Sequence, residues 1–128
     1  MKRTAALILV LAAGCLGPEP VPELPFDARP AMGSMREDAA EIARILGAGR
    51  SLDAVTPARR LAEIQLGPGL EPPPEFRELE EGFRAAAAAL SESLDRGEQR
   101  ENGVRYRVML ERCDACHERF RPGGMAGE

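Results

Sequence analysis

Residues 74–96 read PEFRELEEGFRAAAAALSESLDR, and this stretch decides the fold class of the chain. Its larger apolar side chains recur at steps of three and four residues, which is the spacing of one face of an α-helix. They are Phe76, Leu79, Phe83, Ala87, Leu90 and Leu94. The acids between them, Glu78, Glu80 and Glu81, are expected to form a solvated face. Gly97 follows and predicts the end of the helix.

The same periodicity predicts a helix at residues 28–47, on the N-terminal side of this stretch. Asp27 is expected to cap its first turn, and Gly47 and Gly49 are expected to end it. Its apolar positions are Met32, Met35, Ala39, Ile42, Ile45 and Leu46. We therefore expect an amphipathic helix that turns one face toward a core.

Two further helices complete the pattern. A short one is predicted to begin with Thr56 as its cap and Pro57 at its first position, and to end at residues 67–69, Gly-Pro-Gly. Its apolar residues are Leu61, Ile64 and Leu66. A last helix is predicted at residues 99–121, and no stretch alternates as a strand does. The sequence therefore predicts an all-α protein, an up-down antiparallel four-helix bundle.

The N-terminus has the layout of a bacterial export signal. Lys2 and Arg3 precede an apolar run at residues 5–13. The run is too short to cross a bilayer, because spanning takes about 20 apolar residues. We expect it to act as a signal and to be absent from the mature domain.

Residues 11–15, LAAGC, resemble the lipobox that directs lipoprotein cleavage, with Ala12 where leucine is usual. This resemblance predicts a lipoprotein signal peptide at residues 1–14 and a lipid on Cys15. The alternative is ordinary cleavage near Ala13, which leaves Cys15 as a free thiol.

The rest of the chain divides into a tether, one domain and a tail. Residues 15–27 are predicted to form a stiff proline-rich tether, residues 28–122 the four-helix domain and residues 123–128 a flexible tail. Without the signal peptide the net charge moves from −4 to −6, because two cations and no acid leave with it. An acidic domain without a basic cluster argues against nucleic acid and weakly favours a basic redox partner.

Residues 113–117 read CDACH, the attachment pattern of a c-type haem. Positions three apart on a helix share a face, so Cys113 and Cys116 can both reach the vinyl groups of one porphyrin, and His117 can point at its iron. A zinc site needs four ligands, and Cys15 is the only spare thiol. A redox disulfide of the thioredoxin type needs a strand-to-helix context. One covalently attached haem c is therefore the predicted cofactor, with zinc and a redox disulfide as alternatives.

With this motif on the last helix of a bundle, residues 28–122 resemble the class II cytochromes c, the cytochrome c-prime family. Residues 112–121, RCDACHERFR, carry the likeness, because in that family an aromatic residue and an arginine follow the motif, as Phe120 and Arg121 do here. The resemblance implies that His117 ligates the iron and that Arg121 approaches the proximal face or a propionate. The alternative for Arg121 is a solvated cation at the helix end. The sequence departs from the family in its short second helix and proline-rich link.

The resemblance also implies two options for the sixth iron ligand. Low-spin members use a methionine near the start of the first helix, whereas high-spin members leave the iron five-coordinate. In an antiparallel bundle, Met32 or Met35 can face the iron opposite His117, and Met32 aligns better when counted back from the end of the helix. Both methionines can instead be gap-filling core residues. Tyr106 and Phe120 are expected to pack against the haem edge.

These features predict a c-type haem protein of the bacterial periplasm that is not an enzyme. It is expected to be lipid-anchored through Cys15, at the outer rather than the inner membrane, and to transfer single electrons to redox proteins of the envelope. One alternative is a five-coordinate haem that binds a small gas such as NO or CO. Another is a haem-free helical scaffold of the envelope, and a homodimer is left open.

Overall fold

The chain folds as an all-helical protein in the computed structural model, which describes residues 24–67 and 69–120. That part of the chain contains four α-helices, a short 3-10 helix at Ser51–Ala54 and no strand, so the predicted all-α class is confirmed. None of these helices is long and apolar enough to cross a membrane. The α-helices are α1 (Arg29–Gly47), α2 (Val55–Glu63), α3 (Pro74–Asp95) and α4 (Gln99–Arg119).

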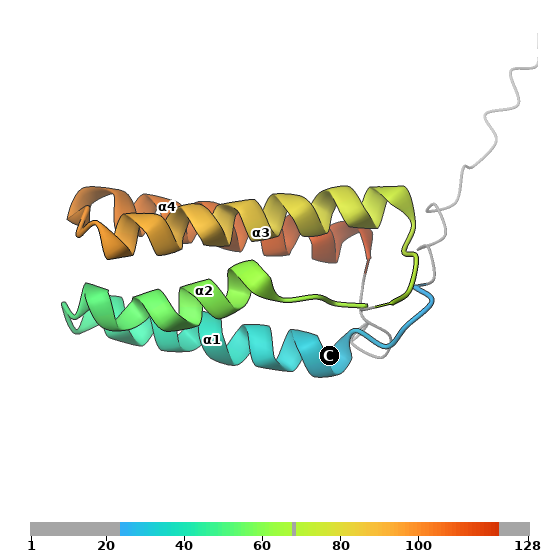
Figure 1. Cartoon of the computed structure of the whole chain (residues 1–128), viewed down its shortest axis with the longest axis horizontal. Coiled ribbons are helices and arrows are strands. Elements are labelled where there is room, and N and C mark those ends of the chain that lie inside the picture. The colour runs from blue at the N-terminus through green and yellow to red at the C-terminus, as the bar shows by residue number, and fades with distance from the viewer. Residues whose placement is uncertain (1–23, 68, 121–128) are drawn as a thin grey trace, which may run out of the picture.

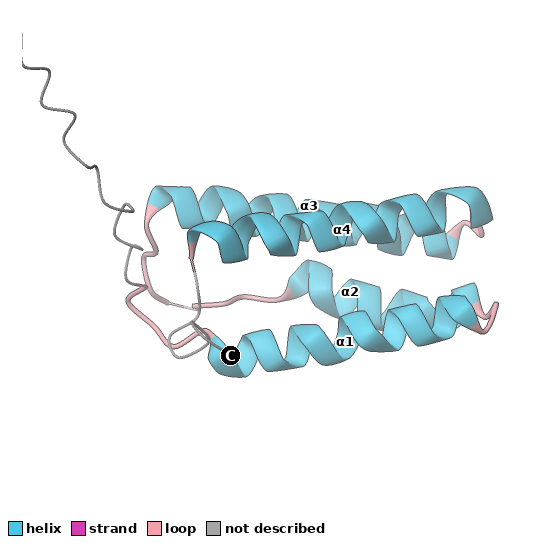
Figure 2. Ribbon diagram, turned by 180° about the vertical axis from the view of Figure 1, so that it is seen from behind, coloured by secondary structure: helices cyan, strands magenta, loops and turns pink. Residues whose placement is uncertain are grey.

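The helices run alternately in opposite directions, with α1 beside α2 and α3 beside α4 (Figures 1 and 2). The α3 helix packs closely along both α2 and α4, whereas the backbone of α4 makes few close approaches to α1. The end of α4 and the start of α1 lie at the same end of the bundle (Figure 1). This is the arrangement that the predicted up-down topology requires.

The ends of α1 follow from local backbone chemistry. At the start, the Asp27 carboxylate accepts the backbone N–H of Arg29 at 3.0 Å and its guanidinium Nε–H at 2.8 Å. These bonds lower the pKa of Asp27 to about 2. At the end, Gly49 has a φ of 71°, which glycine adopts without steric cost, and its N–H donates to the Leu46 carbonyl at 3.1 Å. The predicted stop is present, whereas the N-cap position belongs to Ala28 and Asp27 binds the first N–H of the helix from the residue before it.

The second helix differs from the prediction at both ends. It begins at Val55, directly after the 3-10 helix, so Thr56 lies inside it and does not cap it. It ends at Glu63, and Ile64 is already extended with φ −65° and ψ 139°. Leu66 therefore reaches the core from an extended segment, where its backbone N–H donates to the Glu80 carboxylate at 3.3 Å. Apolar spacing predicted the burial of Leu66 correctly but not its backbone.

An aromatic cluster closes one end of the bundle. The α4 helix ends at Arg119 rather than at residue 121, and Phe120 leaves it in an extended conformation with only 2% of its surface exposed. The Phe76 ring meets Phe120 edge to face at a centroid distance of 5.3 Å and Phe26 at 5.6 Å. Phe76 thus joins the start of α3 to the chain segments before α1 and after α4.

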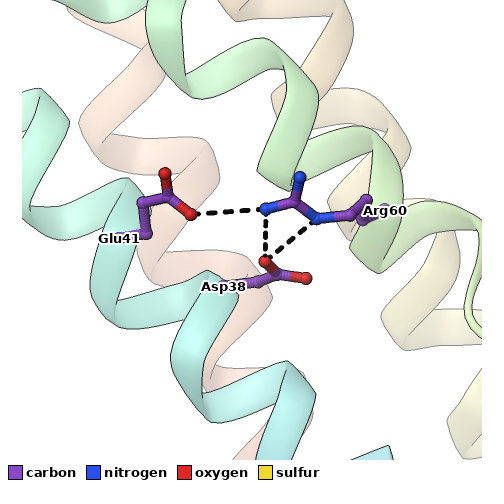
Figure 3. A network of polar contacts seen from close by, with 3 residues as sticks. All are labelled: Asp38, Glu41 and Arg60. Atoms are coloured by element: carbon purple, nitrogen blue, oxygen red, sulfur yellow. Dashed lines mark hydrogen bonds and ion pairs between the residues drawn. The ribbon is translucent and has the colours of Figure 1, made fainter.

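A polar network ties α1 to α2 (Figure 3). The Arg60 guanidinium donates to the Asp38 carboxylate at 2.6 and 3.1 Å and to the Glu41 carboxylate at 3.3 Å. Half of the Arg60 side chain is exposed, so solvent screening keeps the contribution of each pair to stability small. The network fixes which face α1 turns toward α2 more than it adds stability.

Phe76→Ala should lower the free energy of unfolding by about 3–5 kcal/mol, because it removes a fully buried ring that contacts two others. Urea unfolding followed by circular dichroism measures the change. Leu52→Ala is the control, since Leu52 is 67% exposed and its truncation should stay within about 0.5 kcal/mol of the unaltered protein. Equal effects of the two substitutions would contradict the role of the aromatic cluster.

Candidate functional site

An apolar cavity of about 190 Å³ lies inside the described part of the bundle. Side chains of all four α-helices and of the extended segment after α2 form its walls. The apolar residues of its lining are Met32, Met35, Ala39, Leu61, Leu66, Leu79, Phe83, Met109 and Leu110. The same cavity is lined by Cys113, Cys116 and His117, which are consecutive on one face of α4.

The cavity brings together the residues that the sequence predicted as a site. Cys113, Cys116 and His117 come from the last two turns of α4, and Met32 and Met35 come from the first two turns of α1. Cys116 and Met35 are buried, whereas the His117 side chain is exposed and stands at the open side. Five predicted site residues from two distant stretches of sequence therefore line the same cavity.

Tyr106 and Phe120 are not among the residues that line the cavity. Tyr106 is half-buried on α4, and its hydroxyl donates to the Ala39 carbonyl of α1 at 3.0 Å. Phe120 packs in the aromatic cluster at the end of the bundle. That these two residues pack against a haem edge stays a prediction. Arg121 and Cys15 lie outside the described residues.

The two thiols of the motif are held in their neutral form. Burial raises the pKa of Cys113 to about 11, and the charges of Asp114 and Cys116 add to this effect. Burial also raises the pKa of Cys116, with a contribution from the Glu80 carboxylate. A position near the C-terminus of a helix works in the same direction, since the helix dipole disfavours a negative charge there.

This environment bears on the alternatives for the CxxC pattern. A redox or nucleophilic cysteine needs a lowered pKa, as a helix N-terminus or a neighbouring cation provides, and here the pKa values move the other way. Nor do any three His, Cys, Asp or Glu side chains among the described residues gather as ligands of one metal ion. Neither a thioredoxin-like pair nor a protein-only zinc site is favoured by this geometry.

Three charged residues of the lining were not predicted as site residues: Arg36, Glu80 and Arg112. Glu80 was expected on a solvated face, but its side chain is only 13% exposed. It accepts the Leu66 N–H and pairs with Arg84 at 3.5 Å. The sequence did contain a signal for the partial burial of Glu80. It lies three residues before Phe83 and so shares the apolar face of its helix.

The two arginines occupy different parts of the rim. Arg36 follows Met32 by four residues on α1 and is exposed at the cavity. The aliphatic part of Arg112 passes over Gly82 on α3, where a Cβ would come within 4.0 Å of it. The described residues form no ion pair with Arg36 or Arg112, in contrast to Arg60 and Arg84.

Comparison of the chain with family models, with curated proteins and with solved structures gives no match. The site is therefore interpreted from its own geometry and chemistry.

Alkylation of Cys113 by iodoacetamide in haem-free folded protein should accelerate about tenfold per pH unit between about pH 8 and about pH 10. The reason is that only the thiolate reacts and the raised pKa of about 11 keeps its fraction small throughout this range. In urea the same cysteine should approach its maximal rate above about pH 9, since its ordinary pKa is about 8.5. A rate that already levels off below about pH 8 in the folded protein would show an activated thiol and contradict this assignment.

Proposed function

We propose that the protein is a c-type haem protein in which Cys113 and Cys116 hold the porphyrin and His117 ligates its iron. One observation carries the proposal: these three side chains of α4 line a single apolar cavity, and two methionine side chains of α1 line it with them. Thiols, an imidazole and thioethers around an apolar space suit a porphyrin better than any polar substrate.

The two thiols would supply both bonds to the porphyrin. Each S–H would add across one vinyl group, with sulfur on the carbon next to the ring and hydrogen on the terminal carbon. No electron is gained or lost in this addition, and both cysteines are free thiols. Because Cys113 and Cys116 are one helical turn apart, they can reach vinyl groups on adjacent pyrroles.

The cavity also suits the polar edge of a haem. Cys116 is buried, so it would hold the vinyl side of a porphyrin inside the bundle and leave the propionate side for the exposed rim. Arg36 is exposed at the rim and supplies a cation for a propionate. The exposed imidazole of His117 would be covered by the bound ring.

Helix register favours Met32 over Met35 as the sixth ligand. Tyr106 on α4 meets Ala39 on α1, and the two helices are antiparallel. Met32 stands seven residues before Ala39 and His117 stands eleven residues after Tyr106, so both lie toward the same end of the bundle from this contact, and Met32 lies nearer that end than Met35. Met35 lies three residues deeper, which is about 4.5 Å along the helix axis.

A haem ligated by His117 and Met32 would carry out one-electron transfer, because bound haem supplies a reversible one-electron couple and the thioether stabilises its ferrous form. We assign the protein to the class II cytochromes c on this basis. The export-like N-terminus and Cys15 support a lipid-anchored location in the envelope, where redox proteins are the expected partners and no enzymatic activity is proposed. Gas binding at a five-coordinate iron is the second candidate, favoured by the apolar side chains of Leu61, Leu66 and Phe83 in the same cavity.

Co-expression with a cytochrome c maturation system should add the mass of one haem to the full chain. Intact-mass analysis and the pyridine haemochrome assay both measure this. Replacing both Cys113 and Cys116 with alanine should abolish the addition, and replacing either one alone should leave a less stable single attachment. Unaltered protein without added mass would leave the haem-free scaffold as the better interpretation.

Met32→Ala should convert a low-spin ferrous spectrum into a high-spin one, because it removes the thioether of the proposed sixth ligand. Met35→Ala is the matched control on the same helix and should keep the low-spin spectrum. Absorption spectra of the reduced holoproteins, with and without CO, separate the two outcomes. The reverse assignment, with only Met35→Ala becoming high-spin, would show that the register argument is wrong.

A further inference from the structure

We propose that Tyr106 is a positioning residue that sets the distance between α1 and the iron through its hydrogen bond to the Ala39 carbonyl. This inference rests on the proposed haem. It goes beyond that proposal by naming the group that fixes the α1 side of the cavity, which lies opposite the motif on α4. Sequence alone suggested haem-edge packing for Tyr106, whereas the structure gives its hydroxyl a partner on the opposite helix.

The bond is well placed to act as a spacer. The backbones of α1 and α4 make few close approaches, and among the described residues the 3.0 Å contact between Tyr106 and Ala39 is the one hydrogen bond that joins these helices. The other polar contacts of α1 to another helix go to α2, through Arg60. Without the Tyr106 contact, nothing polar in the described part of the chain fixes α1 relative to the helix that carries the motif.

The hydrogen bond between Tyr106 and Ala39 lies only about two helical turns from Met32 and Cys113. The α1 helix is unbroken from Met32 to Ala39, and the α4 helix is unbroken from Tyr106 to Cys113. Each span covers seven residues, or about 10.5 Å of helix, so a shift at the bond is transmitted directly to the cavity. Burial raises the pKa of Tyr106, so its hydroxyl stays protonated and remains a donor at neutral pH.

A second buried hydroxyl offers a matched control. The Ser93 hydroxyl on α3 donates to the Asn102 side chain on α4 at 2.7 Å, and both residues are buried. This bond also joins two helices, but it leaves α1 untouched. Ser93→Ala and Tyr106→Phe thus each delete one interhelical hydrogen bond. Only Tyr106→Phe should change the position of α1 relative to the motif on α4.

The test measures CO association with the ferrous holoprotein after its haem content has been verified. Tyr106→Phe should raise the association rate about fivefold, which corresponds to the loss of one net hydrogen bond. The increase is expected for either coordination state, because CO must displace Met32 from a six-coordinate iron or pass it at a five-coordinate one. Ser93→Ala should lower the thermal stability without changing this rate.

A double-mutant cycle then asks whether Tyr106 acts through Met32. In a Met32→Ala background, Tyr106→Phe should have no further effect on CO association, because the side chain that it positions is gone. An unchanged rate in Tyr106→Phe, an equal increase in Ser93→Ala, or additive effects with Met32→Ala would each overturn the positioning role. Absence of haem from the unaltered protein would instead overturn the proposed function, so the two failures are distinguishable.

Discussion

The separation between α1 and α4 is the constraint on which the rest of the molecule depends. Interiors of proteins are close-packed, whereas here an apolar space of about 190 Å³ separates side chains of α1 from side chains of α4. The chain has four Phe, one Tyr and no Trp, so it has few large side chains with which to close the space. A flat apolar ligand would fill this space, and the two cysteines proposed to hold it lie on α4, across the cavity from the methionines of α1.

Electrostatics and packing act together on that wall. The thiols lie near the C-terminus of α4, in an apolar cavity with Asp114 and Glu80 nearby, and each of these features opposes a thiolate. A thiol with a raised pKa is a weak nucleophile at neutral pH, whereas addition to a vinyl group would produce a thioether that carries no charge. The environment that disfavours the competing uses of CxxC is therefore compatible with haem attachment.

Sequence predicted the elements with strong helical periodicity and missed what depends on tertiary contacts. The bounds of α1 and α3 agree to within one residue, because each has a long apolar stripe and a glycine after its last turn. The ends of α2 were wrong, since a 3-10 helix precedes it and the Glu80 carboxylate holds the following segment extended. The grouping of Met32 with the motif followed from topology, but the hydrogen bond of Tyr106 depends on a register that periodicity alone does not determine.

That register also separates the two candidate functions. In the proposed haem protein, a thioether within reach of the iron would favour a low-spin state, whereas displacement by one helical turn would leave a position for a gas. The difference is about 5.4 Å along α1, and it requires no change in α4 or in the attachment motif. The contacts that hold α1 are few and replaceable: an exposed network with Arg60, a buried apolar face with Ile42 and Ile45, and one bond from Tyr106. If the proposed haem is attached to α4, substitutions on α1 alone would therefore shift the protein between electron transfer and gas binding.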